Sequence, residues 1–249
     1  MNKILAKLND QGYAVSRIEA DITELLDIYR EKIFRDFEDK NLKISRLGGF
    51  IAGHLNYAEN DVSAAIFKKI ITKEILEVIK SHLNTRFLKV RTNSNLNLTG
   101  SHHQHWHYDG DYKNNFIILN VPIVEIDNKN GPTEILKNSH RHITNIREFL
   151  KKYKNLKSKK LELRRTEFVF RDSRLWHRGT SNTSKTHRPM LAFIFERSTN
   201  QDEYFITEGE NSYIYDNMYT GGVLGRLREY IFVYLPALGY IQRFLFKNY

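Results

Sequence analysis

The sequence contains no cysteine and no apolar run long enough to cross a bilayer. The absence of cysteine excludes disulfides, thiolate zinc sites and cysteine nucleophiles, and it leaves His, Asp and Glu as the only strong metal ligands. Residues 1–7 carry neither a sustained apolar segment nor a small-residue cleavage site. We therefore expect a cytoplasmic location, with peripheral contact at the inner membrane surface as an alternative.

Acidic residues are also in the minority, since 29 Asp and Glu oppose 39 Lys and Arg and leave a formal net charge of +10. Most of the excess lies in residues 141–165, where ten basic side chains accompany two acidic ones, Glu148 and Glu162. Such a segment suits nucleic acid or an anionic membrane, but its simplest interpretation is a solvated helix face and loop. Its aromatic residues do not alternate with the basic ones as base-stacking platforms would, which argues against nucleic acid.

The order of the apolar patterns predicts a mainly β (α+β) fold in which helices come first and strands follow. Residues 22–37 and 61–83 repeat apolar side chains at helical spacing, the first of them behind a capping-box pattern formed by Asp21 and Glu24. One more amphipathic helix is expected at 143–153, and short β-like runs occupy 87–91, 93–98, 116–124, 167–170 and 190–195. This order favours a β-sandwich or jelly roll with helices packed on the outside.

The length of 249 residues, without a linker or an internal repeat, suits one domain spanning residues 1–249. We divide it into a helical part (1–84), a core (about 85–200) and a C-terminal amphipathic extension (201–249). Residues 224–249 alternate basic and large apolar side chains, and Pro236 is expected to kink or split a helix there. We favour a terminal helix packed against the core or a second subunit. The alternative is an interfacial segment that contacts a membrane.

Two separated clusters, His107-Tyr108-Asp109 and Trp176-His177-Arg178-Gly179, carry the candidate metal ligands, and Arg188 follows them. Positions i and i+2 of a strand point to one face, so His107 and Asp109 can reach one ion from a single strand. Two imidazoles and one carboxylate form a facial site with open positions, which suits Fe(II) oxygen chemistry. Arg188 adds a planar fork for a carboxylate co-substrate.

The histidine-rich stretch before Asp109 leaves a second ligand set open. His103 and His105 share the parity of His107, and a His105/His107 pair with another histidine would form a cupin-like three-histidine site. His105 is alternatively a substrate contact or a neighbour of the metal ligands. Five other histidines are expected in solvated, loop or supporting positions: His102, His103, His140, His142 and His187.

Residues 101–196 resemble the phytanoyl-CoA dioxygenase (PhyH) family of Fe(II)- and 2-oxoglutarate-dependent oxygenases. Residues 106–109 look like the family's first ligand motif, and 171–179 match the segment of the distal histidine. Residues 130–133 followed by 138–140 resemble its Asn-Gly-Pro turn and Gly-Ser-His signature, with Asn138 in place of the usual glycine. Arg188 stands at the family's offset for its 2-oxoglutarate-binding arginine, 11 residues after the distal histidine.

This resemblance implies a double-stranded β-helix core and a set of roles. His107, Asp109 and His177 would hold Fe(II), and Arg188 would pair with the distal carboxylate of 2-oxoglutarate. The reaction would consume O₂, release succinate and CO₂, and hydroxylate a substrate, because related halogenases replace the carboxylate ligand with a small residue. One departure is Gly179, where family members often carry a hydroxyl side chain that contacts the co-substrate. Thr180 is the candidate substitute.

The substrate is the least constrained part of the prediction. We expect a small or medium anionic metabolite, or a lipid-linked or sugar substrate, which includes phosphorylated and CoA-linked molecules. The basic residues of 141–165 would meet such an anionic group, and residues 224–249 would favour a lipid or surface glycan. Two alternatives remain: a cupin-like metal enzyme that does not use 2-oxoglutarate, and a non-catalytic basic binding module.

Overall fold

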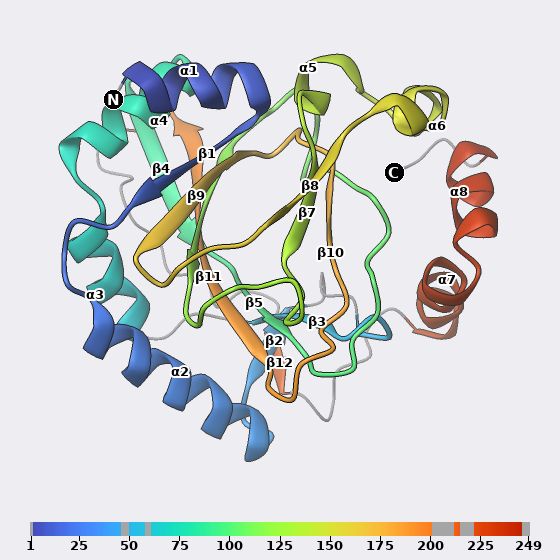
Figure 1. The fold of residues 1–249 in the computed structure, drawn as a ribbon, viewed down its shortest axis with the longest axis horizontal. Coiled ribbons are helices and arrows are strands. Elements are labelled where there is room, and N and C mark those ends of the chain that lie inside the picture. Colours follow the sequence, from blue (N-terminus) through green and yellow to red (C-terminus); the bar gives the residue numbers. More distant parts are fainter. Residues whose placement is uncertain (1, 46–49, 58–60, 201–211, 215–221, 246–249) are drawn as a thin grey trace.

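A computed structural model describes residues 2–45, 50–57, 61–200, 212–214 and 222–245 (Figure 1). Its first half contains α1 (Asn2–Gln11), β1 (Tyr13–Arg17), α2 (Thr23–Glu38), β2 (Lys43–Ser45), β3 (His54–Tyr57), α3 (Asp61–Ile70), α4 (Lys73–Leu83), β4 (Phe87–Thr92), β5 (Ser94–Asn97) and β6 (Ile117–Pro122). The second half contains β7 (Thr133–Leu136), α5 (Ser139–His142), α6 (Ile146–Lys152), the 3-10 turn η1 (Tyr153–Asn155), β8 (Ser158–Leu161), β9 (Glu167–Asp172), β10 (His177–Gly179), β11 (Arg188–Ser198), β12 (Ser212–Ile214), α7 (Gly222–Tyr234) and α8 (Pro236–Leu245).

In the described residues the strands form two antiparallel sheets. The larger has the order β1-β9-β6-β11-β5-β3-β2-β12, with β4 also paired to β11, and the smaller has the order β10-β7-β8. The long central strand β11 alternates its side chains between two apolar clusters. Leu191, Phe193 and Phe195 belong to the main core, whereas Ala192 and Ile194 pack on the opposite face. The predicted mixed α+β fold is confirmed. The predicted order was wrong in one respect, because β1, β2 and β3 lie between the N-terminal helices and join the larger sheet.

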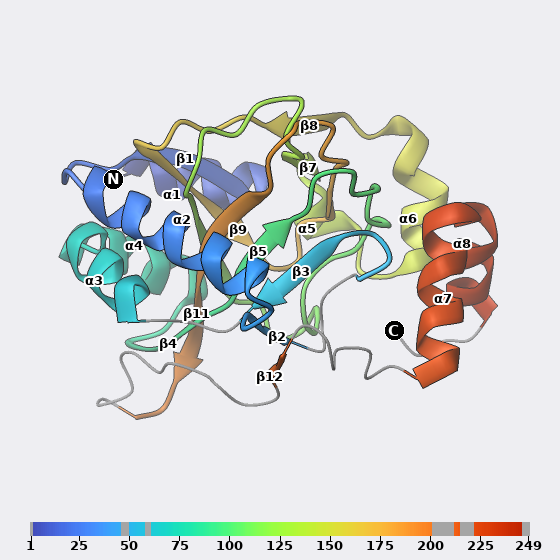
Figure 2. The same ribbon diagram turned by 90° about the horizontal axis from the view of Figure 1, so that it is seen from below.

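The helices lie on two sides of the sheets. Helices α1–α4 cover one side, and α7 and α8 lie at the opposite side (Figures 1 and 2). Residues from α2 and α3, including Tyr29, Ile33 and Phe67, join the main core, so the N-terminal helices are anchored by apolar burial. None of the helices in the described ranges is both long enough and apolar enough to cross a bilayer.

Two details of the helical prediction were wrong. The helix expected over 61–83 is two helices, because Thr72 adopts an extended conformation and its hydroxyl caps α4 by accepting a bond from Ile75 N at 3.3 Å. The capping box at Asp21 and Glu24 does not form. Helix α2 begins at Thr23, and Asp21 instead accepts a bond from Thr23 N at 3.0 Å. The split at Pro236, which begins α8, is confirmed.

Candidate metal centre

His107, Asp109 and His177 converge from two parts of the chain. Their potential ligand atoms all lie within 4.8 Å of one another, and they form the one such His/Asp/Glu group found among the described residues. His177 begins β10, and His107 lies opposite it in an isolated β-bridge with reciprocal backbone hydrogen bonds of 3.0 and 2.8 Å. Asp109 N donates to Ser173 O at 2.8 Å. These backbone bonds fix the separation of the three side chains.

The expectation that His107 and Asp109 share a regular strand was wrong. Outside the bridge at His107, residues 101–116 have no strand structure. Two contacts hold the segment instead: the β-bridge between His107 and His177, and the hydrogen bond from Asp109 N to Ser173 O. The i, i+2 spacing still brings both side chains to one side, because the bridge locally extends the backbone.

The two ligand histidines have their Nδ1 atoms oriented by backbone carbonyls. His107 Nδ1 lies 2.9 Å from His105 O, and His177 Nδ1 lies 2.9 Å from Leu175 O. The tautomer in which Nδ1 donates to these carbonyls is the one that leaves Nε2 unprotonated as the ligand atom of each ring. Both Nε2 atoms face Asp109, at 3.9 and 3.5 Å from its oxygens.

Arg171 supports this arrangement by a contact that sequence reasoning missed. Its Nη1 donates to Asp109 Oδ2 at 2.7 Å and lies 3.0 Å from His177 Nδ1. Burial alone would raise the pKa of Asp109, but the charge of the adjacent Arg171 holds that pKa well below its ordinary value. Burial, with the Arg171 charge, lowers the pKa of His177. An ionised carboxylate beside the neutral His177 imidazole suits a divalent cation, so the residues fit a metal ion.

His105 does not join the ligand group. Its ring packs on Phe232 at a centroid distance of 4.4 Å, and among the described residues no cupin-like histidine set assembles around it. His103 Nδ1 accepts a bond from Ser181 N at 3.1 Å. The described residues therefore do not assemble the alternative three-histidine ligand set around His105 and His107.

Arg188 is a buried cation at the start of β11. Its side chain donates to Gly131 O at 2.8 Å and to Asn95 Oδ1 at 3.3 Å, and it is 1% exposed. Burial lowers its pKa to about 10, so the guanidinium remains charged at neutral pH. In the described part of the chain no carboxylate pairs with it, and its buried Nε has no hydrogen-bond partner. A buried cation with spare donors is a binding site for an anion.

The family of this chain is identified by comparison with known protein families. A family model described as phytanoyl-CoA dioxygenase (PhyH) matches residues 3–190, a range that contains all four candidate residues. The chain belongs to this family. It is therefore a non-haem dioxygenase dependent on iron and 2-oxoglutarate, and His107, Asp109 and His177 form its candidate facial triad.

Solved structures similar to this PhyH-family chain confirm the double-stranded β-helix fold. The non-haem α-ketoglutarate-dependent epimerase SnoN from nogalamycin biosynthesis is 13% identical, with a TM-score of 0.63 over 80% of this chain and 83% of the other. HygX from Streptomyces hygroscopicus, with nickel, 2-oxoglutarate and hygromycin B bound, is 11% identical, with a TM-score of 0.60 over 81% and 89%. EctD from S. alaskensis with bound Fe is 13% identical, with a TM-score of 0.57 over 79% and 76%.

The departure at Gly179 has a structural explanation in this PhyH-family enzyme. The hydroxyl of Thr180, the expected substitute, donates instead to Pro132 O at 2.6 Å. A Cβ atom on Gly179 would overlap Cε1 and Nδ1 of His54, a β3 residue that the sequence analysis missed. His54 is 1% exposed, and its Nε2 lies 2.8 Å from His102 O. Burial, assisted by the charge of Arg188, lowers its pKa to about 3, so its imidazole is neutral and lies within electrostatic reach of Arg188.

We expect Gly179→Ser to lower the free energy of unfolding by about 2 kcal/mol, because its side chain requires the space of the His54 ring. In a His54→Ala background the same substitution should cost less than about 1 kcal/mol, because the ring is gone. Urea unfolding of the four proteins in this double-mutant cycle measures both costs. Equal costs in the two backgrounds would contradict the contact.

His140, in the signature after the Asn-Gly-Pro turn, is buried instead of solvated. It is 2% exposed, its Nε2 lies 3.1 Å from Asn9 O, and a Cβ on Gly12 would lie 2.7 Å from its Nδ1. Burial lowers its pKa to about 4 from an ordinary value of 6.5. The unfolded chain therefore binds a proton that the folded chain excludes between these two pH values.

The wild-type protein should accordingly lose more stability than His140→Gln when the pH falls from 7 to 4. The contribution of the neutral His140 ring to the free energy of unfolding is fully present above pH 6.5 and is lost as the pH falls toward about 4. We expect a difference of about 2 kcal/mol between the two proteins in this loss. Urea unfolding at both pH values measures it, and parallel losses would show that His140 does not titrate in this way.

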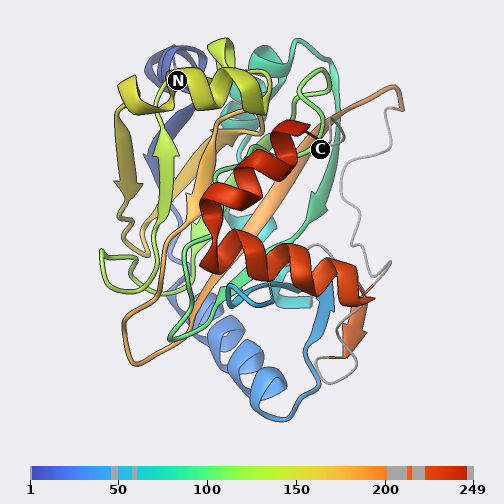
Figure 3. The same cartoon turned by 90° about the vertical axis from the view of Figure 1, so that its right-hand side faces the viewer.

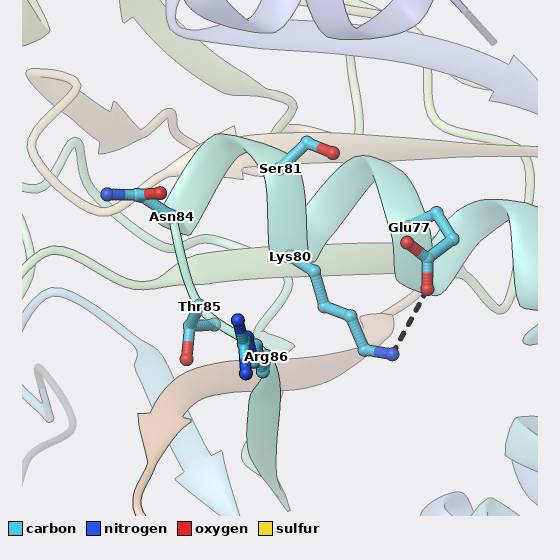
Figure 4. Close-up of a pocket in the computed structure, with 6 residues that line it drawn as sticks. All are labelled: Glu77, Lys80, Ser81, Asn84, Thr85 and Arg86. Carbon is cyan, nitrogen blue, oxygen red and sulfur yellow. Dashed lines mark hydrogen bonds and ion pairs between the residues drawn. The ribbon is translucent and has the colours of Figure 1, made fainter.

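A separate surface pocket lies where α4 ends and β4 begins. It is lined by Glu77, Lys80, Ser81, Asn84, Thr85 and Arg86 (Figure 4). Lys80 Nζ lies 3.1 Å from Glu77 Oε1, so this cation already has an anionic partner. None of the six residues belongs to the candidate metal centre, and we assign the pocket no function.

Proposed function

We propose that His107, Asp109 and His177 bind Fe(II), that Arg188 binds the distal carboxylate of 2-oxoglutarate, and that the enzyme hydroxylates an anionic small molecule. The observation that supports this assignment is the convergence of three potential ligand atoms within 4.8 Å, together with a fully buried arginine that pairs with no carboxylate among the described residues.

Each protein group has a defined task in this proposal. Bound iron, with 2-oxoglutarate, supplies the activation of O₂ and the oxidation of the substrate, while succinate and CO₂ are released. Arg171 holds the Asp109 carboxylate by one oxygen and leaves the other available. The backbone carbonyls of His105 and Leu175 fix the tautomers of His107 and His177. Arg188 fixes the orientation of the co-substrate through a charge-assisted, bidentate pair.

The substrate class follows from charge. The ten basic side chains of residues 141–165 give the enzyme a region of positive potential that attracts an anion. This potential would attract a phosphorylated or CoA-linked molecule, or a sugar or lipid-linked molecule that carries an anionic group. SnoN has been solved in complex with nogalamycin RO and HygX with hygromycin B, and these relatives support an organic molecule as substrate for this chain.

The experiment that tests this function is the anaerobic addition of Fe(II) and 2-oxoglutarate to the purified protein. We expect a weak visible charge-transfer band from the metal-bound co-substrate, and succinate release once O₂ is admitted. Folded, iron-loaded protein without the band would contradict 2-oxoglutarate binding and would favour a cupin-like reaction. Absence of iron binding would favour the basic binding module.

A further inference from the structure

The hairpin of α7 and α8 lies on the outside of the molecule (Figure 3), and seven of its apolar and tyrosine side chains are exposed. On α7 the exposed apolar residues are spaced by four, three and four positions, which aligns them on one helical face. The exposed residues of α8 and the connection are spaced by three. Together they are 48–83% exposed: Val223, Leu227, Tyr230, Tyr234, Leu235, Leu238 and Ile241.

A basic surface lies directly beside this apolar one. Phe149 of α6 stacks on Tyr240 of α8 with ring centroids 5.8 Å apart, so the two helices are in contact. The exposed side of α6 and η1 forms a basic flank, which carries Arg147, Lys151, Lys152 and Lys154. The exposed apolar residues Leu150 and Tyr153 lie on the same two elements. Residues 141–165, which contain this surface, carry ten basic and two acidic side chains.

The hairpin contacts the body of the enzyme through Glu229, Phe232 and Tyr240. Glu229, the sole acidic residue in the sequence from 222 to 249, accepts bonds from Ile51 N at 2.7 Å and Ala52 N at 3.1 Å. Trp106 N donates to Tyr240 Oη at 2.9 Å, and the ring of Phe232 packs on that of His105. Tyr234, although half exposed, also packs on the ring of His102 at a centroid distance of 5.2 Å. The outer face therefore combines aliphatic side chains and Tyr230 with the exposed Arg226 and the basic flank of α6.

We propose that the outer face of α7 and α8, with the basic flank of α6, docks on the surface of an anionic phospholipid bilayer. Aliphatic side chains enter the acyl boundary, tyrosines occupy the headgroup level, and the lysines and arginines meet the lipid phosphates. Both helices are too short to span the bilayer, so they lie in its surface. The hairpin also lies beyond residues 3–190, the range matched by the family model.

The charge distribution favours a bilayer over other occupants. A second copy of the chain docked through the same face would bring two strongly basic flanks together, which is electrostatically unfavourable. Nucleic acid would leave the aliphatic stripe of Leu227, Leu238 and Ile241 without a partner, because bases stack on aromatic rings. An anionic bilayer satisfies both the apolar stripe and the basic flank.

Docking in this orientation would bring the metal centre close to the membrane. His105 and Trp106, which contact the hairpin, immediately precede His107. On the basis of the function proposed above, the substrate is then an anionic molecule carried by a membrane lipid.

Co-sedimentation with phosphatidylcholine vesicles, with and without phosphatidylglycerol, tests docking directly and requires no iron. We expect the full-length protein to partition at least about tenfold more strongly onto vesicles with phosphatidylglycerol, and added salt to weaken that preference. The double variant Leu227→Glu/Leu238→Glu should lose about thirtyfold in partitioning. Ile28→Glu, at an exposed apolar residue of α2 on the opposite side, is the matched control and should partition like the wild type.

The remaining outcomes separate the alternatives. Lys151→Glu/Lys154→Glu should remove the preference for phosphatidylglycerol, since it reverses charge only in the flank. No partitioning of the wild type, or equal loss in Ile28→Glu, would overturn the proposal. A concentration-dependent dimer that Leu227→Glu/Leu238→Glu converts to monomer would assign the face to a second copy. The charge-transfer band, measured without vesicles, should be the same in all these variants, so failure of docking is distinguishable from failure of the proposed function.

Discussion

Asp109→Ala should abolish Fe(II) binding and lower 2-oxoglutarate turnover by at least about a thousandfold, or about 4 kcal/mol in the barrier. The substitution removes one of three ligands, and it also removes the anion that neutralises Arg171. The guanidinium then lies 3.0 Å from His177 Nδ1 without a carboxylate between it and the metal position, so it opposes a divalent cation. Anaerobic Fe(II) titration and succinate release measure the two effects separately.

Two further variants control for folding and for general loss of charge. Asp109→Asn keeps an acceptor for Arg171 and should fold like the wild type while still binding iron poorly. Asp111→Ala removes a carboxylate two residues away, whose bonds are confined to its own turn with Lys113 and Asn114. We expect Asp111→Ala to retain iron binding and turnover. Normal turnover by Asp109→Asn would contradict the assignment of Asp109 as a ligand.

Arg188→Met should weaken 2-oxoglutarate binding by about a hundredfold, which corresponds to about 3 kcal/mol. Methionine fills part of the volume of the buried side chain but has no charge and no donor for the distal carboxylate. Fe(II) binding should be retained, because Arg188 forms no bond to the triad in the described residues. Titration of 2-oxoglutarate into the anaerobic iron-loaded protein, followed by the charge-transfer band, measures the change.

Arg197→Met is the matched control on the same strand. Arg197 also hydrogen-bonds to backbone carbonyls, those of Leu83 and Asn115, but at the other end of β11. Its replacement should cost stability and leave the 2-oxoglutarate affinity unchanged. If both arginine variants weaken the affinity alike, the effect belongs to the stability of β11 and the assignment of Arg188 fails.

Residue types and local spacings were sufficient to predict the chemistry of the site. The i, i+2 pair His107 and Asp109, the later His177 and an arginine at a fixed offset from it are features of the chain itself. The strands at β4, β6, β9 and β11 were also predictable, because alternation and β-branched content are local properties. The break at Thr72 was not predicted, because apolar spacing continued through it.

The sequence could not predict the long-range contacts that support the site and the fold. Arg171 meets Asp109 across 62 positions, His82 meets the buried carboxylate of Asp172 across 90, and Trp106 meets Tyr240 across 134. No periodicity relates such residues, since each pair depends on strand register and on how helices pack against the sheets.

The sequence by itself therefore determined the family, the mixed α+β class and the candidate ligand types, and it predicted Arg188 as the co-substrate arginine. The tertiary structure decided which groups hold those ligands, why residue 179 is glycine beside His54, and which face of the C-terminal hairpin is exposed. Spacing along a chain is fixed by covalent geometry over a few residues, whereas contacts between distant residues exist only once the core has packed.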